Sequence, residues 1–184
     1  MKRWTFGSLL WGARLAVAAM ALVALAVGYQ RLHRSDEQVE LTQYVEHEVP
    51  VLQAEEAVLL ERLRPLSTVP GPTPEAARKL LVDDALPRLI ALRKRAASIV
   101  TKTVVVRGLR DDYIAWLDRL AEACRTSVRA IDDPKADATR SAALLRQRFT
   151  EADEAARRWS EHVRAACVRH RLAAPAALPA AVAR

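Results

Sequence analysis

The sequence predicts an all-α protein in which an N-terminal transmembrane or signal helix precedes an elongated antiparallel bundle of three to four helices. Apolar residues recur at alternating spacings of four and three over most of the chain, as in packed helices. Half of the residues are hydrophobic and few are aromatic, and the N-terminus contains a long uncharged run. We divide the chain into an anchor or signal segment at 1–34, a helical bundle at 35–172 and a disordered Ala/Pro tail at 173–184.

The N-terminal segment is predicted to be a membrane anchor or an export signal. Residues 15–29 carry no charge, and extension back to Phe6 supplies the roughly 20 apolar residues that a transmembrane helix needs, with Arg14 reaching toward the headgroups. A secretory signal cleaved after Ala26 is the alternative, and it would release the domain into the periplasm. We expect the anchor. The membrane is then a partner through residues 6–29, and the chain is a single-pass inner-membrane protein with its C-terminal domain outside the cytoplasm.

The net charge of +7 suggests a nucleic-acid partner, but the positions of the charges argue against one. Five of the 29 basic residues lie in the first 34 positions, and all 22 acidic residues lie at or beyond Asp36. The chain from residue 35 onward therefore has a net charge of only +2. We expect no nucleic-acid partner.

Two helices of opposite charge are expected to pair with each other. The run 88–110 contains seven Lys or Arg and no acid, whereas residues 35–61 contain eight acids and no Lys or Arg. A hairpin folded about residue 70 sets Glu46 opposite Lys94 and Glu48 among Arg93 and Arg95. Each exposed pair contributes only about 0 to 1 kcal/mol, so the pairing orients the hairpin more than it stabilises the fold.

Four helices are expected, at about 36–66, 74–103, 109–131 and 136–172. The last has the most regular pattern, because the spacings in its apolar seam alternate between four and three without a fault. The seam consists of Ala138, Ala142, Leu145, Phe149, Ala152, Ala156, Trp159, Val163, Ala166 and His170.

The first two helices are predicted from an apolar stripe and from the residues at their ends. The stripe consists of Val45, Val49, Leu52, Leu59, Leu63 and Leu66. Thr73 and Pro74 are predicted to be the N-cap and the first residue of the second helix. Pro50 and Pro87 lie inside the apolar pattern, and each predicts a kink or a restart, which Asp84 would cap in the second case.

The middle third continues the apolar pattern in one phase, but its composition favours a break. Seven of the eight residues at 99–106 are β-branched, and Gly108 follows. Both features lower helix propensity. We expect a break between residues 103 and 109 and a restart under Asp111 and Asp112, whose charges suit the start of a helix.

No metal or cofactor site is expected. His47 and His162 would lie at similar heights in the first and last helices, but His47 faces away from the apolar stripe. Cys167 and His170 are spaced i, i+3 and lack further ligands. The sequence contains no haem-attachment motif and no carboxylate–histidine di-metal motif.

The aromatic residues Tyr113, Trp116, Phe149 and Trp159 lie at or beside seam positions, where core packing is the default and a ligand cavity is the alternative. The sequence contains no glycine-rich phosphate loop, no pattern of paired catalytic carboxylates and no nucleophile–base motif. We therefore expect no catalytic residues and a protein that is not an enzyme.

Cys124 and Cys167 are not expected to form a disulfide. In a hairpin that turns near residue 134, Cys124 lies opposite residue 144, and Cys167 lies roughly 35 Å further along the last helix. A disulfide allows a Cα separation of only about 7 Å.

These expectations favour a membrane-tethered, extracytoplasmic helical module that has an interaction or structural role with a protein partner and is non-catalytic. A small-molecule-binding sensor of the four-helix type is the alternative. The two differ in whether the bundle binds a protein or a ligand.

Overall fold

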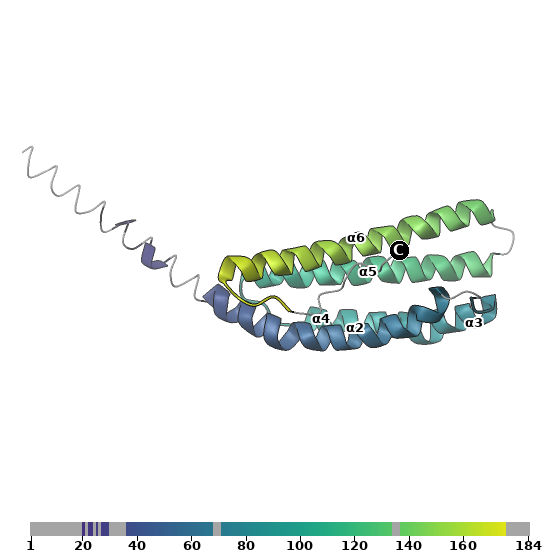
Figure 1. The fold of residues 1–184 in the computed structure, drawn as a ribbon, viewed down its shortest axis with the longest axis horizontal. Helices are drawn as coiled ribbons and strands as arrows, with labels where there is room; N and C mark the ends of the chain where they lie inside the picture. Colours follow the sequence, from purple (N-terminus) through teal and green to yellow (C-terminus); the bar gives the residue numbers. More distant parts are fainter. Residues whose placement is uncertain are drawn as a thin grey trace, which may run out of the picture. The chain divides into compact units, whose positions relative to one another are not determined.

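The computed structural model describes residues 20, 22, 23, 25, 27–29, 36–67, 71–133 and 137–175. All regular structure in these residues is helical, and five α-helices, α2 to α6, pack together (Figure 1). The chain divides into two units, Met1–Val39 and Glu40–Arg184, and the second unit contains these five helices. Among the described residues, no helix is long and apolar enough to cross a membrane. Residues 6–19 of the predicted anchor lie outside the described part.

The helical chain continues through Pro50 and Pro87, because a π-helical segment precedes each proline. The segment η1 (Tyr44–Glu48) leads into α2 (Val49–Leu63), and η3 (Leu80–Ala85) leads into α4 (Leu86–Ser98). In both places the N–H of the residue before the proline donates to the carbonyl five residues back. This wider turn moves away the carbonyl that a proline ring would meet in a regular α-helix. Of the two outcomes predicted for each proline, a kink or a restart, the restart is therefore wrong.

The second helical segment begins as predicted and runs without interruption from α3 (Pro74–Lys79) through η3 into α4. The Thr73 side chain accepts the N–H of Ala76 at 3.3 Å, and Pro74 follows as the first helical residue. Asp84 does not cap α4. Its carboxylate pairs instead with Arg88 and, at 3.8 Å, with Arg62 of α2.

The predicted break exists, but its predicted position between residues 103 and 109 is wrong, because the chain leaves the helix earlier, at residues 99–103. The next helix, α5 (Val104–Asp132), contains the valines and Gly108. Thr103 caps it by accepting the N–H of Val106 at 3.4 Å. The cap and the burial of Val106, which is 1% exposed, outweigh the weak helix propensity of the β-branched residues.

Glu40 holds the connection between α4 and α5 against the first helical segment. Its carboxylate accepts the backbone N–H of Lys102 at 2.5 Å and of Thr103 at 2.7 Å. Burial opposes its ionisation, but the hydrogen bonds from Thr103 and Lys102 keep the pKa of Glu40 below its ordinary value. The predicted restart of the helix at Asp111 and Asp112 is also wrong, because α5 already begins after its N-cap at Thr103.

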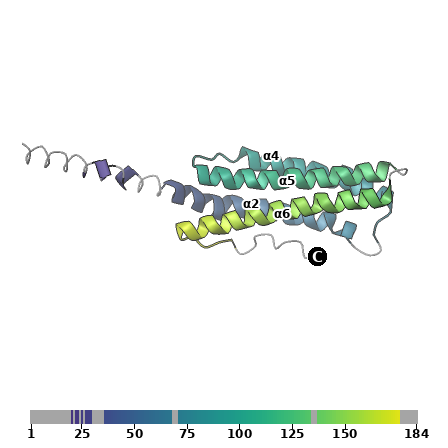
Figure 2. The ribbon, with the colours of Figure 1, turned by 90° about the horizontal axis from the view of Figure 1, so that it is seen from above.

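The helices α5 and α6 (Ala138–His170) form a long hairpin, whose members lie side by side in Figures 1 and 2. Asp137 caps α6 by accepting the N–H groups of Thr139 and Arg140. Arg171 follows α6 with a φ of 57°, the left-handed conformation common just past a helix end. Residues 176–184 of the predicted tail lie outside the described part.

The predicted apolar patterns form the core, except in the first half of α6. The stripe of α2 and the pattern of α4 and α5 are buried or partly buried. On α6, Ala152, Trp159 and Val163 are buried, but Ala142 is exposed and Phe149 is 39% exposed. Because α6 packs mainly against α5, the first half of its seam is only partly covered.

Candidate functional site

An aromatic cluster lies in the core between η1, α5 and α6. The ring of Tyr113 lies 5.2 Å from that of Trp116, edge to face, and 4.8 Å from that of Trp159. All three side chains are buried. They pack against one another, which supports the core-packing interpretation of the sequence. Phe149 is partly exposed, so it lies outside this core cluster.

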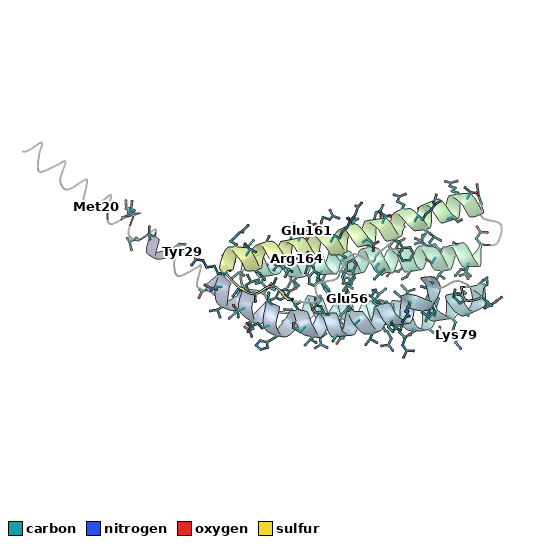
Figure 3. The ribbon with its side chains drawn as sticks, in the orientation of Figure 1. Met20, Tyr29, Glu56, Lys79, Glu161 and Arg164 are labelled. Carbon is teal, nitrogen blue, oxygen red and sulfur yellow. The ribbon has the colours of Figure 1, made fainter. Side chains whose placement is uncertain are left out.

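Glu56 is the charged side chain that the structure buries and the predicted stripe omits. It is 4% exposed, and no other charged side chain of the described residues is buried. Figure 3 shows it on α2, on the side toward the other helices. Burial raises the pKa of its carboxyl to about 7, and its Oε2 atom has no hydrogen-bond partner among the described residues. Its spacing from Leu52 and Leu59 continues the alternation of four and three, which is the signal in the sequence.

The hydroxyl group of Tyr113 lies close enough to Glu56 to be affected by its charge. The hydroxyl of Tyr113 donates a long hydrogen bond of 3.5 Å to the carbonyl of Leu52. Burial raises the pKa of Tyr113, and the charge of Glu56 raises it further. Burial also raises the pKa of Tyr44, whose hydroxyl has no well-formed hydrogen bond. The arrangement can hold a proton on Glu56 near neutral pH.

The histidines and cysteines do not come together as ligands. His47 is exposed on η1, and the Nδ1 atom of His162 lies 2.7 Å from a carboxylate oxygen of Asp112. Within the described ranges, no group of three His, Cys, Asp or Glu residues is arranged to hold a metal ion. Cys124 and Cys167 are both buried and free, in agreement with the predicted hairpin geometry. Burial raises the pKa of Cys124 to about 11, which suits a packing role.

The basic run 88–110 pairs with acids of the same chain, but in a different register from the predicted one. Arg95 pairs with Glu55, two helical turns beyond Glu48. Arg93 pairs with Asp118 of α5 at 2.6 Å, so its partner is not on the first helix at all. These ion pairs are about half exposed at each member. The expected pairing therefore exists in part, and the register set by folding about residue 70 is wrong.

Two surfaces of the bundle expose apolar side chains beside unpaired arginines. One is the first half of α6, where Leu144 is 41% exposed and Phe149 39%. We call it the α6 surface and define it by Arg140, Ala142, Leu144, Arg146 and Phe149. The other lies at the opposite end of α6, and we call it the valine end.

The valine end is formed by the connection between α4 and α5 and by the last turn of α6. We define it by Val100, Val104, Arg107, Val168, Arg169 and Arg171. The segments that form it, residues 99–110 and 162–175, contain no acidic residue.

A cleft of about 410 Å³ lies between η1 and the connection that follows α4. Its polar lining residues include Glu40, Gln43, Glu48, Arg95 and Ser98. None of these residues was singled out as a ligand-binding residue from the sequence.

Comparisons of the chain with protein-family models, with curated proteins and with solved structures found no match. The class of this protein is therefore described from its own fold and site, without a similar protein. The chain is an all-helical bundle with an aromatic core and a buried carboxyl group.

Proposed function

We propose that this protein is a membrane-tethered, extracytoplasmic helical module with an interaction or structural role, and that it is non-catalytic. The observation that carries the proposal is the uncovered part of the α6 seam. The apolar seam of α6 is buried at Ala152, Trp159 and Val163 and exposed at Ala142 and Phe149. Leu144 is a further exposed apolar residue in the same half of the helix, beside the seam. A row of apolar side chains that the bundle covers over only part of its length is typical of a surface that packs against another molecule.

The charge of the α6 surface indicates the chemistry of its partner. Residues 138–150 contain three arginines and no acid. Arg148 pairs with Glu151 at 2.9 Å, whereas Arg140 and Arg146 form no ion pair among the described residues. A second copy of this surface would bring arginines together, so a partner with an acidic, amphipathic helix fits it better.

The proposed tether is the segment 6–29, which would place the bundle on the extracytoplasmic side of the inner membrane. Its length and its basic and aromatic flanks support an anchor. Tethering confines the α6 surface to the region near the membrane, and it would favour a partner that is itself membrane-associated.

Affinity capture of the full chain from detergent-solubilised membranes tests the interaction. The double variant Leu144→Ser, Phe149→Ser removes the apolar side chains of the α6 surface, and Val58→Ser, Ile90→Ser is a matched control on α2 and α4, where both residues are similarly exposed. We expect the wild type and the control to recover the same specific protein and the α6 variant to lose it, with equal thermal stability. Recovery that is the same for all three chains would contradict the proposal.

The alternative function, a small-molecule sensor, is favoured by the cleft beside η1. Its volume of about 410 Å³ is in the range of small-ligand sites. A ligand that raises the melting temperature of the wild type, but not that of Gln43→Ala, would support this function over the interaction module.

A further inference from the structure

Three large apolar side chains at the valine end are far more exposed than any others in the described part of the bundle. Val100 is 84% exposed, Val104 78% and Val168 76%, whereas the next in the unit Glu40–Arg184, Ile90, is 56% exposed. They come from the connection after α4, the first residue of α5 and the last turn of α6. Figures 1 and 2 show the start of α5 and the end of α6 at the same end of the bundle.

The chain enters the bundle at this same end. Glu40 is the first residue of the unit, and its carboxylate accepts the N–H groups of Lys102 and Thr103. Eleven residue steps separate it from Tyr29, the last residue of the uncharged run. That length of chain covers roughly 16 Å as a helix and at most about 36 Å when extended. The length of chain therefore allows the valine end to reach the surface of a membrane that holds the tether.

The charges around the valines suit a lipid surface. Arg107, Arg169 and Arg171 are exposed and form no ion pair among the described residues. The carboxylate of Glu40 is already occupied by backbone N–H groups. Asp36 and Glu37 lower the net charge of the adjoining segment. Attraction to anionic lipid is thus moderate, and the valines must contribute much of the contact.

We infer that the valine end rests on the bilayer that anchors the chain, with the valines at the boundary of headgroups and acyl chains and the arginines on lipid phosphates. This inference rests on the proposed tether. It assigns one end of the bundle to lipid and leaves the α6 surface, whose Arg140 and Leu144 lie near the opposite end of α6, for a protein partner.

Depth-dependent quenching of the full chain in vesicles of phosphatidylcholine and phosphatidylglycerol tests the inference. A fluorophore is attached to Val100→Cys or, as the distal control, to Arg140→Cys, in a background of Cys124→Ala and Cys167→Ala. Lipids with a nitroxide on the headgroup should quench the label at 100 several-fold more than the label at 140. Val104→Ser with Val168→Ser should reduce quenching at 100, whereas Val58→Ser with Ile90→Ser should not.

Two outcomes separate this inference from the tether on which it rests. A chain that leaves the vesicles during a high-salt and carbonate wash contradicts the tether, and with it the inference. If the chain is retained and the labels at 100 and 140 are quenched equally, the tether stands and the contact of the valine end with lipid is refuted.

Discussion

At the scale of single residues, Glu56 makes the stability of the bundle depend on pH. Its folded-state pKa of about 7 lies above its ordinary value of 4.5, so the folded state binds more protons between these values. The stabilising effect of protonation is fully present below pH 4.5 and is lost as the pH rises through 7. The shift corresponds to a penalty of at most about 3 kcal/mol above pH 7.

The variant Glu56→Gln removes this dependence, because the amide keeps the shape of the carboxyl and does not ionise. We expect the variant to be more stable than the wild type at pH 8 and about equally stable at pH 5. Urea unfolding at both pH values measures the difference. Glu154→Gln, an exposed change on α6, is the control. A gain from Glu56→Gln that is the same at pH 5 and pH 8 would mean that the carboxyl does not titrate in this window.

At the scale of helices, Thr103 sets the start of α5. Its side chain accepts the N–H of Val106, and an N-cap of this kind contributes about 1 kcal/mol. We expect Thr103→Ala to lower the free energy of unfolding by about that amount and to speed amide exchange at residues 104–106. Thr101→Ala, in the same connection, should have a smaller effect. Equal effects of the two changes would show that the cap does not determine where α5 begins.

The partner of Arg95 distinguishes the observed register from the predicted one. Arg95→Glu should destabilise the bundle by at most about 1 kcal/mol, because the pair with Glu55 is about half exposed. Glu55→Arg should restore part of this loss, since the pair is then re-formed with its charges exchanged. Thermal unfolding of the double-mutant cycle measures the coupling. Rescue by Glu48→Arg in place of Glu55→Arg would support the register predicted from the sequence.

At the scale of the whole molecule, the location of the protein depends on whether the N-terminal segment is retained. We expect the full-length chain to stay in the membrane fraction after a carbonate wash, because roughly 20 apolar residues are enough to span the hydrocarbon core. Fractionation followed by mass determination of the N-terminus decides the point. A soluble mature chain that begins at Val27 would show that the segment is a cleaved signal.

The pattern of apolar residues predicted much of the bundle, because burial in a helix follows a local period. The stripe from Val45 to Leu59 is buried and the pattern of α5 is buried or partly buried, as expected, and Thr73 caps the second helical segment. The break after α4 was predicted at the wrong position, because it was predicted from helix propensity alone. Propensity does not account for an N-cap or for a carboxylate that reaches the backbone from another helix. Thr103 and Glu40 provide these contacts.

The sequence by itself determined the helical class, the approximate ends of the helices and the separation of Cys124 from Cys167, because each depends on spacing along one or two adjacent helices. Only the tertiary structure decided that Glu56 is buried, that Arg95 pairs with Glu55 and that the first half of α6 keeps Phe149 partly exposed. These features depend on how helices of unequal length are aligned against one another. A one-turn shift in that alignment changes which side chains meet and which remain uncovered, while the apolar pattern of each helix stays the same.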